Sequence, residues 1–139
     1  MYLTDSDYST LINDYDLDVV QQSEELTRQK AEAAAIEYFK GYLRSRYDVA
    51  ELFARAEDER DPVLIQFLID EVLYTLHSTL PGNMMPEIRR ERKDAVDKWL
   101  LDVRKGLTQP DFPTIDDDET TDLGNPVRFG GSKKLESAW

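Results

Sequence analysis

The sequence predicts an all-α protein: a small antiparallel bundle of three longer helices, with a short N-terminal helix before it and an extended C-terminal arm after it. Apolar residues recur at three- and four-residue spacing over three long stretches. Residues that start and stop helices separate these stretches. The 139 residues, 40% of them hydrophobic, suffice for one modest core. We therefore expect a helical domain over residues 1–106 and an acidic arm over residues 107–139.

The first predicted element is a short helix over about residues 5–13. Thr4 can serve as its N-cap, and Tyr8 begins an apolar series at helical spacing. The polar residues 13–18 are expected to form a turn. Ser23, followed by two glutamates, then predicts a long helix that continues to about Tyr47.

Two neighbouring apolar stripes run along this long helix, so its apolar arc is wide. One stripe contains Tyr38 and Tyr42, and the other contains Leu43 and Tyr47. An arc of this width indicates contact with two other helices, or with one helix and a neighbouring subunit. Residues 49–60 are expected to be a connector with a short strand or turn in VAELF.

The second long helix is predicted from Asp61, as N-cap, to about Leu80, with Pro62 at its first position. Its long apolar stripe indicates the central and most buried helix. A third helix is expected between Pro86 and Gly106. Its predicted inward residues are Ile88, Ala95, Val96, Trp99 and Val103.

The charge balance restricts the classes of partner. With 17 Lys+Arg against 29 Asp+Glu, the formal charge is -12, which repels nucleic-acid phosphates and disfavours a sequence-reading DNA binder. An acidic surface suits basic protein partners or the wall of a channel through which DNA passes. The sequence contains no cysteine, no apolar run near the roughly 20 residues of a membrane span, and no signal-peptide pattern at its start.

Residues for catalysis or metal binding are scarce. His77 is the only histidine, and no phosphate-binding glycine loop or nucleophile motif is present. His77 projects near Asp70, but without a nucleophile a structural or surface histidine is favoured over a general base. The run Asp116–Glu119 lacks the spacing of a calcium loop, so a solvated acidic segment is favoured. We expect no enzyme, no metal and no cofactor.

Two arginines, Arg46 and Arg92, project within apolar arcs. An unpaired buried guanidinium costs several kcal/mol, so each is expected to meet a carboxylate or backbone carbonyls, or to face an adjacent subunit. Glu32, Asp70 and Glu71 are candidate partners. The alternative is an arginine that extends to solvent along its aliphatic stem.

The C-terminal arm lacks helical periodicity but carries scattered apolar residues. Pro- and Asp-rich tails are commonly disordered. Regular scattering of anchors instead favours an arm that docks on a partner, with each anchor in a pocket. The anchors are Phe112, Ile115, Leu123, Phe129 and Trp139.

Three segments carry a resemblance to a known family: residues 33–48 (AAAIEYFKGYLRSRYD), 61–76 (DPVLIQFLIDEVLYTL) and 89–106 (RRERKDAVDKWLLDVRKG). They resemble the small helical head–tail connector proteins of tailed bacteriophages, in particular the Mu-like connector family. The similar features are a helix ending in Tyr-Leu-x-x-Arg-Tyr, a Pro-x-Leu helix start and a final Arg-containing helix. In this chain they are Tyr42, Leu43, Arg46 and Tyr47; Pro62 and Leu64; and Arg92 to Gly106.

The resemblance implies a structural virion protein at the head–tail junction, made in the host bacterial cytoplasm. Such a subunit forms a twelve-fold ring beneath the portal protein, extends the DNA channel, and presents a surface to stopper or tail proteins. DNA would pass the lumen without specific binding. The residues expected at subunit or partner interfaces are Tyr38, Tyr42, Arg46, Tyr47, Arg92 and Trp99, together with the anchors of the arm.

The alternative is a small acidic inhibitor or DNA mimic that binds a basic nucleic-acid enzyme. A mimic should array its carboxylates in paired rows. Along the long helix the charges instead alternate in sign, as the series Glu37, Lys40, Arg44 and Asp48 shows. This layout favours the connector.

Overall fold

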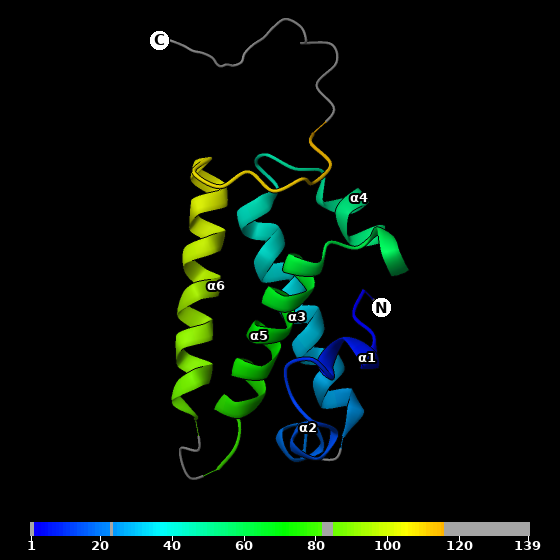
Figure 1. Cartoon of the computed structure of the whole chain (residues 1–139), viewed down its shortest axis with the longest axis vertical. Helices are drawn as coiled ribbons and strands as arrows, with labels where there is room; N and C mark the ends of the chain where they lie inside the picture. Colours follow the sequence, from blue (N-terminus) through cyan, green and yellow to red (C-terminus); the bar gives the residue numbers. More distant parts are fainter. Residues whose placement is uncertain (1, 23, 82–84, 116–139) are drawn as a thin grey trace, which may run out of the picture.

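The fold is described from a computed structural model of the chain, over residues 2–22, 24–81 and 85–115. Within these ranges the secondary structure is helical and contains no strand, so the all-α prediction is confirmed (Figure 1). Three long helices are α3 (Glu25–Leu43), α5 (Pro62–Ser78) and α6 (Glu87–Lys105). The shorter elements are α1 (Asp5–Tyr8), α2 (Asp14–Val20), α4 (Val49–Ala54) and a single 3-10 turn, η1 (Glu57–Glu59).

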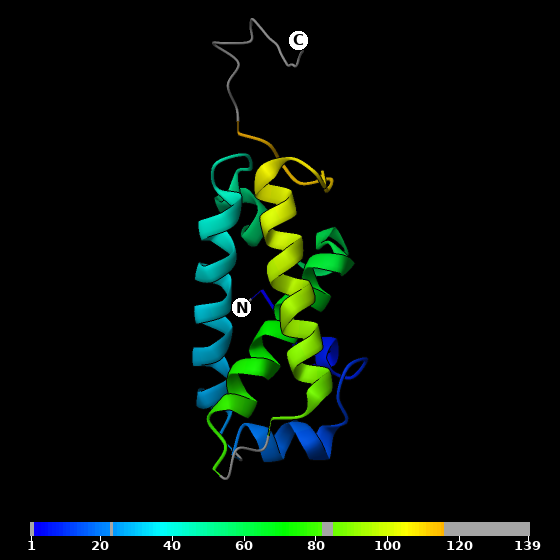
Figure 2. The same ribbon diagram turned by 90° about the vertical axis from the view of Figure 1, so that its left-hand side faces the viewer.

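Helix α5 is central, as the sequence predicted. It contacts α3, α6, α1 and α2, and α3 and α6 also contact each other (Figures 1 and 2). Its fully buried side chains include Leu68, Ile69 and Leu73. Because α5 packs against both α3 and α6, its buried side chains hold these two helices in position relative to each other.

The ends of α5 and α6 follow their capping residues. The Asp61 side chain accepts hydrogen bonds from the backbone N–H groups of Val63 (2.9 Å) and Leu64 (3.1 Å), which α5 cannot satisfy internally. Helix α6 ends at Gly106, whose φ of 82° is left-handed. Both predicted boundaries are confirmed.

The N-terminal region differs from the prediction. The expected helix over residues 5–13 is only the single turn of α1, and residues 13–18 are not a turn but belong to α2. The physical reason is the N-cap at Asn13, whose side chain accepts a hydrogen bond from the backbone N–H of Asp16 at 2.8 Å. That bond begins a new helix in a different direction.

The segment after α3 also differs. Helix α3 ends at Leu43 rather than near Tyr47, and the expected strand or turn in VAELF is the helix α4. Asp48 caps α4 by accepting a hydrogen bond from the backbone N–H of Glu51 at 3.1 Å. Tyr47 leaves the helix and forms an isolated antiparallel bridge with Thr114.

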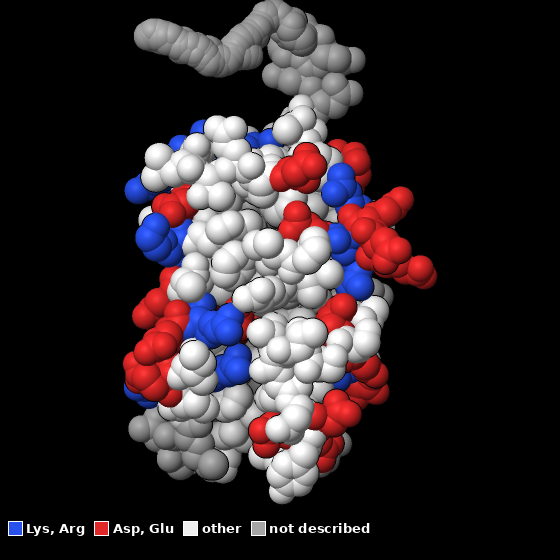
Figure 3. Space-filling view, in the orientation of Figure 1, with Lys and Arg blue, Asp and Glu red and all other residues white. Residues whose placement is uncertain are grey.

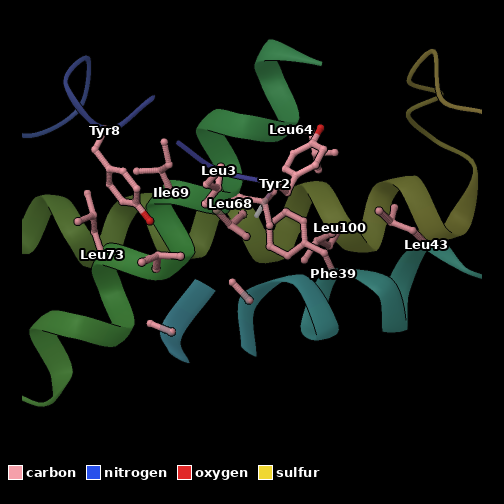
Figure 4. Packing of buried hydrophobic residues seen from close by; sticks show 14 of the residues in the cluster. Tyr2, Leu3, Tyr8, Phe39, Leu43, Leu64, Leu68, Ile69, Leu73 and Leu100 are labelled. Carbon is pink, nitrogen blue, oxygen red and sulfur yellow. The ribbon is translucent and has the colours of Figure 1, made fainter. Parts of the chain in front are cut away.

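The core lies between the three long helices and is closed by the N-terminal segment. Figure 4 shows Tyr2, Leu3 and Tyr8 beside the buried side chains of α5. On α6 the predicted inward residues Val96 and Val103 are buried. Two others were wrongly predicted, because Ile88 and Ala95 are exposed and Leu100 is buried instead. The inward face of α6 is centred roughly 100° around the helix from Ala95, because Val96, Leu100 and Val103 are the buried residues that pack toward α5.

Two arginines fasten the N-terminal segment to the long helices. Arg60 donates hydrogen bonds to the carbonyl of Tyr2 (2.8 Å) and to Asp7 Oδ2 (2.6 Å), and Arg28 donates to Asp5 Oδ1 (2.6 Å). Burial alone would raise the pKa of Asp7, but the hydrogen bonds from Arg60 and Thr4 lower it below its usual value. Asp7 therefore stays ionised in the pair.

No helix in the described part of the chain is both long and apolar enough to cross a membrane.

Candidate functional site

The most distinctive surface is formed by aromatic and basic side chains of α3 and α6, and we call it the tyrosine surface. Tyr38 and Tyr42 lie one turn apart on α3, with ring centroids 5.4 Å apart in an edge-on arrangement. Lys93 Nζ lies 4.5 Å from the Tyr38 ring, and Arg104 Cζ lies 4.8 Å from the Tyr42 ring. Each ring of α3 is thus paired with a cation of α6.

A polar network holds the Tyr38 end of this surface. Lys93 donates hydrogen bonds to Glu71 (2.8 Å) and Asp97 (3.0 Å), and the Tyr38 hydroxyl donates to Asp97 at 2.9 Å. Burial is the main cause that raises the pKa of Tyr38, and the hydrogen bonds with Tyr42 and Asp97 raise it further. Burial would lower the pKa of Lys93, but its two carboxylate partners raise it. Both groups therefore remain protonated and act as donors.

Arg46 closes the other end of the tyrosine surface. Its Nε donates a hydrogen bond to the backbone carbonyl of Arg104 at 3.0 Å, one of the last carbonyls of α6. Its guanidinium also lies against Gly106, where an added Cβ would stand 2.9 Å from Arg46 Nη2. The expectation that Arg46 meets a backbone carbonyl is confirmed, although the residue is exposed rather than buried.

A second aromatic cluster attaches residues 107–115 to the helices. Tyr47 and Phe112 pack edge-on at 5.5 Å, Phe112 lies 6.2 Å from Trp99, and Trp99 lies 4.8 Å from Phe67. The Asp48 N–H also donates to the carbonyl of Pro113 at 2.8 Å. Tyr47 and Phe112 are buried, and burial raises the pKa of Tyr47.

This second cluster changes the roles of several predicted interface residues. Tyr47 and Phe112 bury each other within one chain, so they present no open surface to a partner in this structure. Ile115 is 46% exposed and does present one. The remaining predicted anchors, Leu123, Phe129 and Trp139, lie outside the described residues.

Asp70 forms a buried charge cluster between α5 and α6. Its side chain is fully buried, and Nη1 atoms of Arg89 and Arg92 each lie 3.6 Å from its oxygens. Neither oxygen accepts a hydrogen bond from a described residue. Burial raises the pKa of Asp70, against the opposite effects of Arg92 and Arg89. The sequence named Asp70 as one of three candidate partners for Arg46 and Arg92, but it missed Arg89, whose pKa is lowered by burial.

Glu32, another predicted partner, has different contacts from those expected. It accepts a hydrogen bond from the Tyr8 hydroxyl and lies 3.5 Å from Arg28 Nε. Burial raises the pKa of Glu32. A signal for this pair was present, because Arg28 and Glu32 are four residues apart on one helix, the spacing at which opposite charges meet.

His77 has a structural contact. Its Nδ1 lies 2.8 Å from the carbonyl of Leu73, one turn earlier on α5. It lines a pocket of about 480 Å³ between α2, the end of α5 and the start of α6, with apolar walls that include Val19 and Ile88. Among the described residues, no three His, Asp or Glu side chains are placed to hold a metal ion. The acidic run Asp116–Glu119 lies outside those residues.

Comparisons with protein families, with curated proteins and with solved structures find no match to this chain.

Proposed function

We propose that this chain is a structural virion protein, a head–tail connector subunit that forms a ring below the portal, extends the DNA channel and links the capsid to the tail. The observation that carries the proposal is the tyrosine surface. Tyrosine and arginine, which are residue types enriched at protein interfaces, are held there in fixed positions on two packed helices. The resemblance in residues 33–48, 61–76 and 89–106 supplies the kind of assembly.

In this proposal α3, α5 and α6 are the antiparallel bundle that forms the body of each subunit. Adjacent copies pack side by side, and the Tyr38, Tyr42 and Arg46 side takes part in that contact. Fixed side chains lose little conformational freedom when a partner arrives, so the polar network at Asp97 and Lys93 supports such a role.

The net negative charge of the chain supports a role in the wall of a DNA channel. A chain with a formal charge of -12 produces a negative wall when many copies surround a lumen, and such a wall repels the DNA backbone instead of binding it. DNA can then pass without being held at particular positions.

The C-terminal region supplies the link to other proteins. Phe112 holds residues 107–115 on the body, so the chain that follows Ile115 starts from a fixed position. We propose that the later apolar residues, Leu123, Phe129 and Trp139, dock on the portal or on a stopper or tail protein.

The test is negative-stain electron microscopy of this protein mixed with the portal protein encoded near it. Side views of the mixture are compared with side views of the portal alone. The expected result is an added layer of density with the portal's symmetry. Unchanged portal rings, with this protein remaining free at high concentration, would refute the connector assignment.

A further inference from the structure

Several basic side chains near the C-terminal end of α6 lack acidic partners. Arg28, Arg60 and Lys93 each pair with at least one carboxylate. By contrast, four cations at or just beyond the last residues of α3 and α6 form no ion pair with a described residue. These cations are Arg44, Arg46, Arg104 and Lys105. In a chain of formal charge -12, four neighbouring cations without carboxylates call for an explanation.

Local contacts hold Arg44, Arg46 and Arg104 in place without neutralising them. Arg44 Nε donates to the carbonyl of Lys40 at 3.2 Å, and Arg46 Nε donates to that of Arg104. Leu107 follows directly, and 74% of its surface is exposed. We call Arg44, Arg46, Arg104, Lys105 and Leu107 the basic edge. It combines positive charge with one projecting apolar side chain.

The opposite side of the molecule carries the complementary features. The segment of α4 and η1 has four exposed acidic residues that form no ion pair with described residues: Glu51, Glu57, Asp58 and Glu59. A pocket of about 550 Å³ lies among them, lined by Glu51, Ala54, Arg55 and Glu59. Two carboxylates and one cation, Arg55, therefore line this pocket, which we call the acidic pocket.

The end of α6, which carries Arg104, Lys105 and Leu107, lies on the opposite side from α4 at similar height, and the end of α3 lies between them. Figure 1 shows the C-terminal end of α6 at the upper left and α4 at the upper right. Figure 3 shows basic side chains along the upper left edge and, on the upper right edge, a projecting group of acidic side chains with basic side chains beside it. Surfaces that complement each other and face away from each other cannot meet within one molecule, but they can meet between copies.

We propose that the acidic pocket of one copy receives the basic edge of a second copy. Leu107 would enter the pocket against Ala54, and the flanking arginines and lysine would face Glu51 and Glu59. Such a contact joins different surfaces of identical subunits, so it repeats around a ring when the rotation closes. The opposite charges would speed encounter and set the orientation. The inference rests on the proposed side-by-side packing of copies, but it needs no portal.

The first measurement is sedimentation velocity of the full chain over a wide concentration range at low and at high salt. We expect self-association that increases with protein concentration and weakens at high salt, because the contact is between exposed charges. A chain that remains monomeric at the highest concentration and lowest salt would overturn the proposal.

Charge reversal then identifies the surfaces. Variant one carries Arg44→Glu and Lys105→Glu, and variant two carries Glu51→Lys and Glu59→Lys. Each alone should weaken association at least about tenfold, the equivalent of about 1.4 kcal/mol. An equimolar mixture of the two variants should restore association. The reversed basic edge of variant one fits the reversed acidic pocket of variant two, and the two unchanged surfaces also fit each other.

The matched control carries Lys30→Glu and Arg90→Glu. These exposed residues lie on the same two helices, toward their N-terminal ends, and undergo the same change of charge. The control should associate almost as the natural chain does, and circular dichroism should show that all variants are folded. The proposal fails if the control weakens association as much as the two test variants, or if mixing the test variants restores nothing.

These results are independent of the portal experiment. Restored association in the mixture, together with unchanged portal rings, would keep the subunit contact and reject the connector function. An added layer on the portal, with self-association unaffected by either charge reversal, would keep the connector function and reject the proposed subunit contact.

Discussion

At the residue scale, Asp70 has the least favourable surroundings of the described carboxyl groups. It lies in the core without a hydrogen bond from any residue that the structure describes, and its two guanidinium neighbours are at 3.6 Å. A buried ion pair of this geometry recovers only part of the cost of removing its charges from water. We expect its value to the fold to be specificity, because a shift of α6 along α5 would move Arg89 and Arg92 away from Asp70.

Asp70→Asn should change how stability depends on pH. Burial raises the pKa of Asp70, so the folded protein holds this proton at a pH where the unfolded chain has lost it. Stability from this group therefore increases as the pH falls through the folded-state pKa toward the unfolded one. The free energy of unfolding of the natural chain minus that of Asp70→Asn should rise as the pH is lowered from about 7 to about 4, by about 1.4 kcal/mol per unit of pKa difference.

Urea denaturation at a series of pH values measures this difference. Asp94→Asn, an exposed carboxyl on α6, controls for the loss of one negative charge. If this difference in the free energy of unfolding stays constant or falls as the pH is lowered, the pKa of the Asp70 carboxyl is not raised.

The sequence could predict which positions carry unusual charges but not all of their partners. It identified Arg92 from its place in an apolar arc and named Asp70 as a candidate partner. It missed Arg28 and Arg60, whose partners Asp5 and Asp7 lie 23 and 53 residues away. Periodicity reports the face of a helix on which a residue lies, whereas an ion pair depends on the folded path of the chain.

At the element scale, the end of α6 depends on a glycine. Gly106→Ala should cost about 1–2 kcal/mol, because a left-handed φ of 82° is unfavourable for a residue with a Cβ and that atom would meet Arg46. Gly41→Ala in α3 is the matched control. Nothing lies within 4 Å of its added Cβ, so it should stabilise the protein by about 0.5–1 kcal/mol. Urea denaturation of both variants tests the opposite signs.

The attachment of residues 107–115 depends on one aromatic ring. Phe112→Ala should cost about 3 kcal/mol, since it removes a buried ring from between Tyr47 and Trp99. It should also speed hydrogen exchange of the Asp48 N–H, which donates to the carbonyl of Pro113. Ile115→Ala removes an exposed side chain and should change stability by less than about 0.5 kcal/mol. Equal effects of the two substitutions would contradict this anchor.

The longer elements were predictable and the shorter ones were not. The helices α5 and α6 have strong periodicity and marked ends at Asp61 and Gly106, so their bounds agree with the prediction. The helices α2 and α4 have seven and six residues, too few for periodicity to decide. Their remaining signal was the cap, Asn13 in one and Asp48 in the other, and caps also occur in turns.

At the scale of the whole molecule, net charge should exclude DNA binding. A fluorescein-labelled duplex titrated with the protein at physiological salt should show no change in anisotropy up to about 0.1 mM, the weak limit of non-specific binding. The negative field of the chain and the few unpaired cations at the basic edge are the physical reason. Micromolar affinity would contradict a lumen that DNA passes freely, and a basic DNA-binding protein serves as positive control.

The fastening of the N-terminal segment by Arg60 has a consequence for the order of folding. The bonds from Arg60 to Tyr2 and Asp7 join residues 58 and 53 apart, whereas α5 and α6 are neighbours in sequence and can pair early. Closing so large a loop costs entropy that is recovered only when its ends meet a surface already formed. We therefore expect residues 2–8 to be the last to pack during folding and the first to detach, which would expose part of α5 while the long helices stay formed.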